Sequence, residues 1–291
     1  ALPMQHKLLE LIDGRLRDAG DDAFEEKRNV RAALVYGMSG GNPMTLLSVL
    51  NRPTLSDEDR KLGKGVLAYL HGSTELAQTT LADVDPTAMT PEIGAFLALV
   101  KGSVSASGDE ATALGYFDSA RLLGPGTLVE EAALRRSLAI EASLDKTDRF
   151  FLASAQYVRR FLRSPYASQF ADSFVTGVLT LHKTLNYPAI DEITAMMDAD
   201  QRKVIYLRLA RRAAIEGLTE LSAFAAKRAE DGVPDDRPDA RSALYSSLST
   251  LTSENIDQVV AQLRNIDRQQ LAESDIRLLE AAEAVVNGVT A

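Results

Sequence analysis

The sequence contains no cysteine and no tryptophan, and it has only three histidines among 291 residues. The lack of cysteine excludes disulfide bonds, thiolate nucleophiles and zinc sites built on thiolates. The histidines, His6, His71 and His182, lie far apart and form no pair with metal-ligand spacing, so the sequence predicts no metal site. Neither a Walker sequence nor a Gly-x-Gly-x-x-Gly motif is present, and we predict no bound cofactor.

Long apolar runs are also absent. No run of 18 apolar residues occurs, so we expect no direct insertion into a membrane. The first residues, ALPMQHKLLE, lack the basic region, apolar stretch and cleavage site of a secretion signal. Because the chain starts on Ala instead of Met, we expect a processed or trimmed protein rather than an intact cytosolic one. The absence of cysteine fits the periplasm without deciding the compartment.

The balance of charge argues against nucleic acid as a partner. The chain carries 32 Lys and Arg against 41 Asp and Glu, a formal net charge of −9. Only the middle of the chain, residues 130–212, has more basic than acidic residues, thirteen against ten. A nucleic-acid binder neutralises several phosphates and needs a larger basic excess.

The hydrophobic pattern is helical almost throughout. Met4, Leu8, Leu11, Ile12 and Leu16, for example, fall on one face of a predicted helix. No run of alternating β-branched residues is bounded by a tight-turn dipeptide. The sequence therefore predicts an all-α protein of about fourteen to sixteen helices, joined by short loops into antiparallel hairpins.

Helix starts are marked by capping residues. A polar side chain precedes a proline, or a group of acids, at Asn42, Thr90, Ser164 and Ser56. Such a side chain accepts a hydrogen bond from a free backbone N–H of the first turn. A proline in the first turn removes no hydrogen bond within the helix, because its missing N–H would have no partner there. These positions predict helices that begin near residues 43, 57, 91 and 165.

A sequence repeat makes the fold prediction more specific. A small residue, an aromatic residue, a second small residue and a proline occur at offsets 0, 4, 7 and 12, as in the second helix of a tetratricopeptide repeat. The copies are Ala113, Phe117, Ala120 and Pro125; Ala153, Tyr157, Arg160 and Pro165; and, more weakly, Ser222, Ala226, Ala229 and Pro234. Their separation exceeds the usual 34 residues, so we predict a degenerate tetratricopeptide-like, right-handed solenoid. The alternative is a generic helical bundle.

Domain boundaries are weakly marked. We predict a single α-solenoid domain over residues 1–291, with a possible soft boundary at 231–238. That segment is acidic and contains two prolines and one glycine.

One motif suggests an enzyme. Gly37, Ser39 and Gly41 satisfy the Gly-x-Ser-x-Gly pattern of a hydrolase nucleophile elbow. The elbow requires a preceding strand in a mostly parallel sheet, and the chain offers almost no strand signals. A flexible loop between two helices is the better interpretation, and no catalytic residue is predicted.

The segment QYVRRFLRSPYASQFADSF, residues 156–174, interleaves arginines with tyrosines and phenylalanines. Such residues can form a core with arginine stems over its surface. They are also the residue types that dominate protein-protein contacts. Both interpretations stay open from the sequence.

Five long segments are the most distinctive in the chain: LPMQHKLLELIDGRL (2–16), LVYGMSGGNP (34–43), LGPGTLVEEAALRRSLAIEA (123–142), YVRRFLRSPYASQFADSF (157–174) and KVIYLRLARRAAIEGLTELSAFA (203–225). These segments resemble the MotC family of periplasmic flagellar motility proteins from rhizobia and related bacteria. The resemblance covers most of the chain and contains no catalytic signature.

This resemblance implies a secreted, non-enzymatic periplasmic protein required for flagellar rotation. Members of the family bind and stabilise the periplasmic part of the stator protein MotB, begin with a secretion signal and extend further at their termini. The resemblance assigns no contact residues. From residue type and the basic middle of the chain, we expect the partner to contact Arg136, Tyr157, Arg160, Arg163 and Tyr166. A scaffold for another envelope or cytosolic complex is the alternative function, and the oligomeric state is open.

Overall fold

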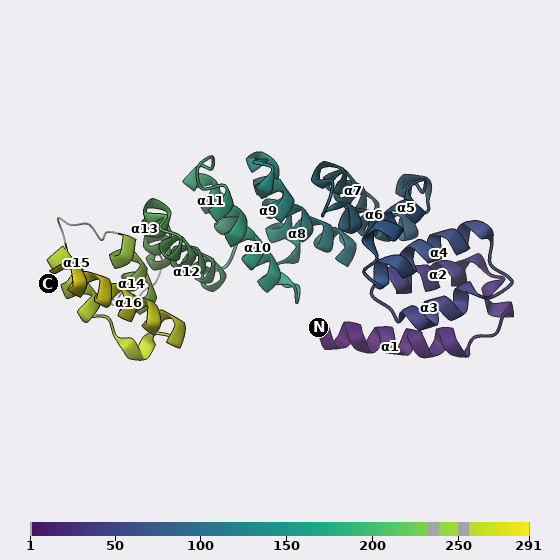
Figure 1. The fold of residues 1–291 in the computed structure, drawn as a ribbon, viewed down its shortest axis with the longest axis horizontal. Coiled ribbons are helices and arrows are strands. Elements are labelled where there is room, and N and C mark those ends of the chain that lie inside the picture. The colour runs from purple at the N-terminus through teal and green to yellow at the C-terminus, as the bar shows by residue number, and fades with distance from the viewer. Residues whose placement is uncertain (1, 232–238, 250–255, 291) are drawn as a thin grey trace. The chain divides into compact units, whose positions relative to one another are not determined.

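The computed structural model describes residues 2–231, 239–249 and 256–290 (Figure 1). This described part contains sixteen α-helices, three short 3-10 helices and no strand. The prediction of an all-α protein is therefore confirmed. Most of the predicted soft boundary, residues 232–238, lies outside the described residues.

The chain divides into two compact units, Ala1–Phe170 and Ala171–Ala291. The helices that lie within the first unit are α1 (Leu2–Asp18), α2 (Lys27–Met38), α3 (Pro43–Leu50), α4 (Asp57–Leu70), α5 (Thr74–Leu81), α6 (Pro91–Ser105), α7 (Glu110–Leu123), α8 (Leu128–Ser143) and α9 (Thr147–Phe161). Helix α10 (Ala167–Thr180) begins in the first unit and ends in the second. The second unit continues with α11 (Tyr187–Thr194), α12 (Ala199–Ile215), α13 (Thr219–Glu230), α14 (Ala240–Ser249), α15 (Ile256–Arg264) and α16 (Glu273–Thr290). The single solenoid domain and its right-handed course stay predictions.

Helices that follow one another pack as hairpins: α6 against α7, α8 against α9, and α12 against α13 (Figure 1). The repeat predicted from the sequence falls on the second helix of each pair. In α7, Ala113, Phe117 and Ala120 are buried, and in α13 so are Ser222 and Ala226. In α7 and α13 the offsets therefore mark the inner face of the second helix, where small residues let its partner approach. In α9, Ala153 and Tyr157 are buried as well, but the third offset is Arg160, which is exposed.

The α6/α7 hairpin shows how close this approach is. A Cβ atom added to Gly102 of α6 would lie 2.6 Å from Cε1 of Phe117. Phe117 itself is almost completely buried. The glycine leaves the space that the aromatic ring of the repeat fills.

Two of the four predicted capping side chains form the expected hydrogen bond, and α6 begins at Pro91 as predicted although the side chain of Thr90 forms none. The side chain of Asn42 accepts from the backbone N–H of Met44 at 2.9 Å, and that of Ser56 accepts from the N–H of Asp59 at 3.1 Å. Helix α10, however, starts at residue 167 instead of 165. The hydroxyl of Ser164 accepts from the N–H of Tyr166 at 3.2 Å, so this residue closes a turn before the helix and is not its cap.

Helix α1 packs on α2 and α3 through a polar residue. The Oδ1 atom of Asp13 accepts hydrogen bonds from the hydroxyls of Tyr36 at 2.6 Å and Thr45 at 2.5 Å. The Oδ2 atom pairs with Arg17 at 2.7 Å. The carboxylate is buried, whereas most of the apolar stripe of α1 faces outward.

Within the described residues, no helix combines the length and apolarity needed to cross a lipid bilayer. The cores of both units are built instead from the inner faces of their helices.

Candidate partner-binding surface

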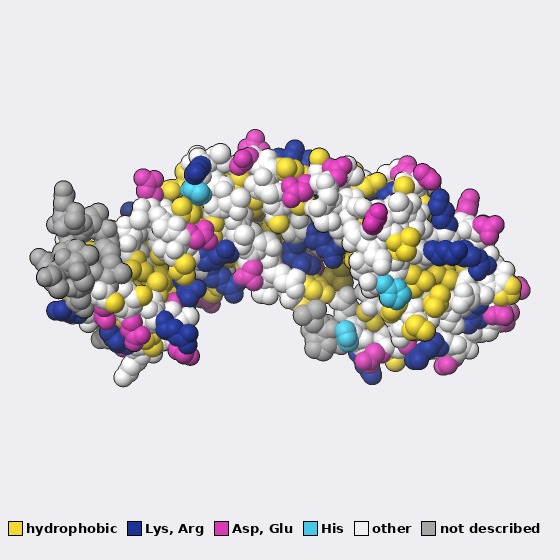
Figure 2. Space-filling view, in the orientation of Figure 1, with side chains coloured by type: hydrophobic (Ala, Val, Ile, Leu, Met, Phe, Trp, Pro, Cys, Tyr) yellow, Lys and Arg dark blue, Asp and Glu magenta, His cyan; other side chains and the backbone are white. Residues whose placement is uncertain are grey.

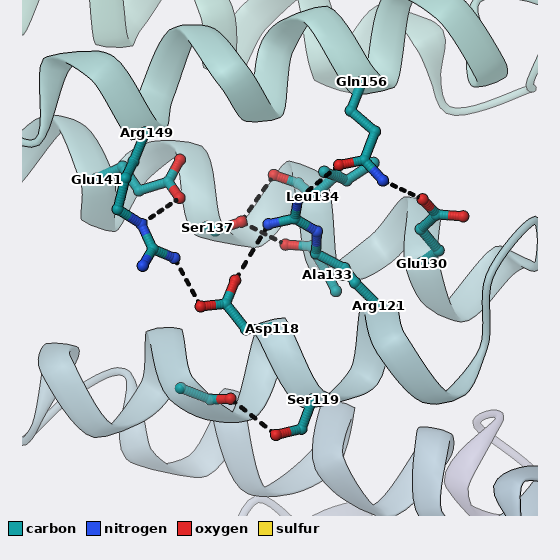
Figure 3. Close-up of polar contacts among 11 residues, drawn as sticks. Asp118, Ser119, Arg121, Glu130, Ala133, Leu134, Ser137, Glu141, Arg149 and Gln156 are labelled. Carbon is teal, nitrogen blue, oxygen red and sulfur yellow. Dashed lines mark hydrogen bonds and ion pairs between the residues drawn. The ribbon is translucent and has the colours of Figure 1, made fainter.

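A buried carboxylate connects helices α8 and α9 and the turn before α8; Figure 3 shows its contact with Gln156. Glu130, in the first turn of α8, is fully buried and accepts from Nη1 of Arg160 at 2.8 and 2.9 Å. It also accepts from the amide of Gln156 and from the backbone N–H of Gly126. The Arg160 side chain is 49% exposed, but its charge compensates a carboxylate that would otherwise be unpaired inside the protein.

A second buried carboxylate ends the same network (Figure 3). Glu141 of α8 lies 3.5 Å from Nε of Arg149, which also binds Asp118 of α7 at 2.7 Å. Arg121 joins Asp118 at 3.1 Å and extends to Gln156. Burial raises the pKa of the Glu141 carboxyl, and the charge and hydrogen bond of Arg149 offset this only in part. These contacts hold α7, α8 and α9 together and are structural.

Tyr157, expected to contact a partner, is fully buried. Its hydroxyl donates to Oε1 of Glu131 at 2.8 Å, and its ring stacks on Phe170 with centroids 4.1 Å apart. Burial, followed by the hydrogen bond to Glu131, raises the pKa of the Tyr157 hydroxyl. Tyr157 is therefore a core residue, and the expectation that it meets a partner at the surface is wrong.

Tyr166 lies in the turn immediately before α10 and is half-buried. The guanidinium of Arg135, from α8, lies over its ring at 4.8 Å from the centroid. The Arg135 side chain also donates to the amide oxygen of Gln169. On the other side, the Tyr166 hydroxyl donates to the side chain of Gln5 in α1.

Arg136 and Arg163 are exposed. Arg136 donates to the hydroxyl of Ser103 in α6. Arg163 lies in the turn between α9 and α10, three residues before Tyr166. We call Arg135, Arg136, Arg163 and Tyr166 the arginine surface; Figure 2 shows Lys and Arg side chains gathered where this part of the first unit is hollowed.

The hydrogen bonds that Arg135 and Arg136 donate go to neutral side chains, Gln169 and Ser103, and no hydrogen bond joins Arg163 to a described residue. None of its three arginines forms an ion pair with a described carboxylate. The Nε atom of Arg135 is buried without a hydrogen-bond acceptor in the described part of the chain. Burial lowers the pKa of Arg135, although the side chain stays charged at neutral pH. The nearby carboxylate of Glu131 offsets part of the charge of Arg135, whereas Arg136 and Arg163 are exposed and form no ion pair with a described residue, so this surface offers positive charge to an anionic group.

Four of the five predicted contact residues lie at least partly on the surface: Arg136, Arg160, Arg163 and Tyr166. Arg160 is committed to Glu130 and Tyr157 to Glu131. Arg135, which stacks on Tyr166, was missed. Its position, four residues after Glu131 on the same helix face, was the available signal.

The serine motif does not form a nucleophile elbow. Ser39 ends helix α2, and its hydroxyl donates to the backbone oxygen of Val35 at 2.7 Å. Gly40 follows with a φ of 90°, the left-handed conformation that terminates helices. Among the described residues no strand precedes the serine, so the structural context of a hydrolase is missing.

Comparison with known proteins decides the family. The family model described as Chemotaxis protein MotC matches residues 1–291. The chain belongs to the MotC family. It is 38% identical to the chemotaxis protein MotC of Rhizobium meliloti (strain 1021) over 291 residues, which is 99% of this chain and 67% of that protein. No solved structure matches the chain. This member of the MotC family is thus a motility and chemotaxis protein, as the resemblance implied.

The second unit of this MotC family member contains a pocket of about 280 Å³ between α11, α12 and α13. Its charged residues are largely paired: Arg228 binds Asp191 at 2.6 and 2.9 Å and Asp231 at 3.0 Å. The Tyr206 hydroxyl donates to the same Asp191 at 2.5 Å. No group of three potential metal ligands occurs among the described residues.

Proposed function

We propose that this MotC family member is a non-enzymatic periplasmic motility protein that binds and stabilises the periplasmic part of the stator protein MotB. The arginine surface is the contact, and it binds carboxylates of a MotB segment. The single observation that supports this most is that Arg135, Arg136 and Arg163 have neutral partners or none, and no described carboxylate pairs with them.

The chemistry of the surface fits a protein partner. The guanidinium of Arg135 stacks on the ring of Tyr166 and donates to Gln169. It therefore loses little conformational freedom when it binds a carboxylate. Arg136 and Arg163 add charge beside it and increase the rate of encounter with an acidic segment. Arginine and tyrosine at the centre of an interface commonly contribute most of the binding energy.

The test is calorimetric titration of the chain with the purified periplasmic domain of MotB at two salt concentrations. We expect binding that weakens as salt rises, because the contacts are between exposed charges. The double variant Arg136→Glu/Arg163→Glu should bind at least tenfold more weakly and lose most of the salt dependence.

The matched control is Arg31→Glu. Arg31 is an exposed arginine of α2, and it forms no ion pair with another described residue. This variant should bind as the wild type does. Arg160 is unsuitable for the test, because its reversal would also leave Glu130 buried without a counter-ion. Absence of wild-type binding, or equal binding by the double variant, would contradict the proposed contact.

A further inference from the structure

Helix α1 exposes large apolar side chains that a surface helix normally buries. Met4, Leu8 and Leu11 are 67%, 53% and 58% exposed, and Ile12 at the edge of the stripe is also exposed. Apolar side chains also reach the surface over the neighbouring α3 (Figure 2), where Met44 is exposed. A contiguous exposed apolar stripe on a folded protein marks a site of interaction.

The outward orientation of this stripe is fixed by polar contacts. Asp13, on the opposite side of α1, is buried and accepts hydrogen bonds from Tyr36 and Thr45. Rotating α1 to bury Leu8 and Leu11 would bring Asp13 to the surface and leave two buried hydroxyls without their acceptor. Each such loss costs about 1–3 kcal/mol. The fold therefore holds the apolar stripe outward.

The spacing of the stripe suits a helix as the occupant. Met4, Leu8 and Leu11 are separated by four and then three residues. This is the spacing of a seam between two helices that run side by side. Arg15, the next position of the seam, is exposed and has no ion pair with a described residue.

One end of the stripe lies beside the arginine surface. Gln5, next to Met4 in the first turn of α1, accepts the hydrogen bond from Tyr166. The stripe therefore begins beside Tyr166, on which Arg135 of α8 stacks, and runs along α1 to Arg15. A ligand that covers both needs acidic groups at its ends and an apolar face between them.

We propose that α1 is the docking site for an amphipathic α-helix of the partner, with acidic residues placed against Arg135 and Arg136 at one end and Arg15 at the other. The helix packs its apolar face on Met4, Leu8 and Leu11. Because α1 has 17 residues, its length is about 25 Å, and a partner helix of four to five turns would cover it. This inference rests on the proposed function, since it specifies the partner segment bound there.

The experiment compares the double variant Leu8→Glu/Leu11→Glu with wild type in titrations against the periplasmic domain of MotB. Both leucines are already exposed, so circular dichroism and thermal melting should be unchanged. We expect binding at least tenfold weaker with its salt dependence retained. The matched control is Leu122→Glu/Leu152→Glu, two leucines of α7 and α9 that are 81% and 65% exposed, and it should bind normally.

A photo-crosslinking residue at position 11 identifies the secondary structure of the occupant. Crosslinks to MotB residues three or four apart support a helix, whereas crosslinks to alternate residues would contradict it. Normal binding by Leu8→Glu/Leu11→Glu overturns the docking site and leaves the proposed function intact. No wild-type binding overturns both.

Two other occupants give distinct results. If wild type sediments as a dimer and Leu8→Glu/Leu11→Glu as a monomer, with binding to MotB unchanged, the stripe joins two copies of this chain. If only the wild type binds vesicles of phosphatidylethanolamine and phosphatidylglycerol, again with MotB binding unchanged, the stripe contacts lipid. Either result contradicts a helix of MotB as the occupant.

Discussion

The hydroxyl of Tyr157 donates a 2.8 Å hydrogen bond to Glu131, and both side chains lie inside the first unit. The other oxygen of the Glu131 carboxylate is buried without a partner among the described residues. Tyr157 therefore donates a buried hydrogen bond to this carboxylate, whose charge Arg135 also offsets, and its ring stacks on Phe170. Its place in a conspicuous arginine- and tyrosine-rich segment reflects packing.

Replacing Tyr157 with phenylalanine should lower the free energy of unfolding by about 1–3 kcal/mol, because Glu131 loses its donor while the ring is kept. Chemical denaturation measures this change in the free energy of unfolding. Tyr116→Phe is the control, since the hydroxyl of this half-buried residue makes no hydrogen bond with a described residue, and its change should be near zero. Equal stability of both variants would contradict the role of the buried pair.

Gly102→Ala should destabilise the α6/α7 hairpin by about 1–3 kcal/mol, because the added methyl group would overlap the buried ring of Phe117. Gly115→Ala in α7 is the opposite case. A Cβ at Gly115 meets no atom within 4 Å, and alanine is the better helix former, so this variant should be slightly more stable. Thermal melts of the two variants should shift in opposite directions.

Glu141 predicts that the stability of the folded chain depends on pH. Burial raises the pKa of its carboxyl, so the folded chain binds this proton more readily than the unfolded chain does. The resulting stabilisation is complete below the unfolded pKa and is lost as the pH rises through the raised folded pKa. Relative to wild type, Glu141→Gln should therefore gain stability as the pH rises from about 4 to 7. Glu75→Gln, at an exposed position, should show no such trend.

Asp13 predicts a pH dependence of stability that is opposite in sign to that of Glu141. Burial by itself would raise the pKa of Asp13, but the hydrogen bonds from Thr45 and Tyr36 and the charge of Arg17 lower it overall. Its stabilisation is present above the unfolded pKa of about 3.9 and is lost as the pH falls through the lower folded value. Asp13→Asn should release α1, seen as faster hydrogen exchange of its amides near neutral pH. Asp18→Asn, at an exposed position, should leave exchange unchanged; unchanged exchange in Asp13→Asn would show that this carboxylate does not hold α1.

Arg160→Ala should lower the free energy of unfolding by about 3–5 kcal/mol, because it leaves Glu130 buried without its counter-ion. Arg159→Ala changes the neighbouring exposed arginine of the same helix and should be within about 0.5 kcal/mol of wild type. Urea unfolding of the two variants distinguishes an arginine that stabilises the fold from one that only adds charge.

The features that the sequence predicted correctly depend on neighbouring residues. Asn42 and Ser56 cap their helices because a cap needs only the next few backbone N–H groups. The repeat around Phe117 was readable because its offsets lie within one helix. Tyr157 was misplaced because its partner, Glu131, is 26 residues away, and the ion pair between Arg160 and Glu130, which spans 30 residues, was likewise not predicted. No local pattern shows that these acids are buried.

The residue types of the arginine surface could be predicted from the sequence, but the full set of residues that form it could not. Arg136, Arg163 and Tyr166 were expected from the basic, aromatic-rich middle of the chain. Arg135 belongs to the surface only because α10 brings the ring of Tyr166 to it. The apolar stripe of α1 was visible as a helical pattern, but its outward orientation depends on the contacts of Asp13 with α2 and α3.

The hydrogen bond between Tyr166 and Gln5 joins residues that are 161 positions apart in the chain. Hairpins such as α6/α7 need only adjacent helices and form early, whereas contacts between distant residues must await loop closure. The first turn of α1 is thus among the last parts of the first unit to find its neighbour. Asp13 meets Tyr36 and Thr45 across only 23 and 32 positions, so α1 can pack on α2 and α3 well before this contact forms. The bond between Tyr166 and Gln5 then closes the first unit by joining its first helix to the turn before α10.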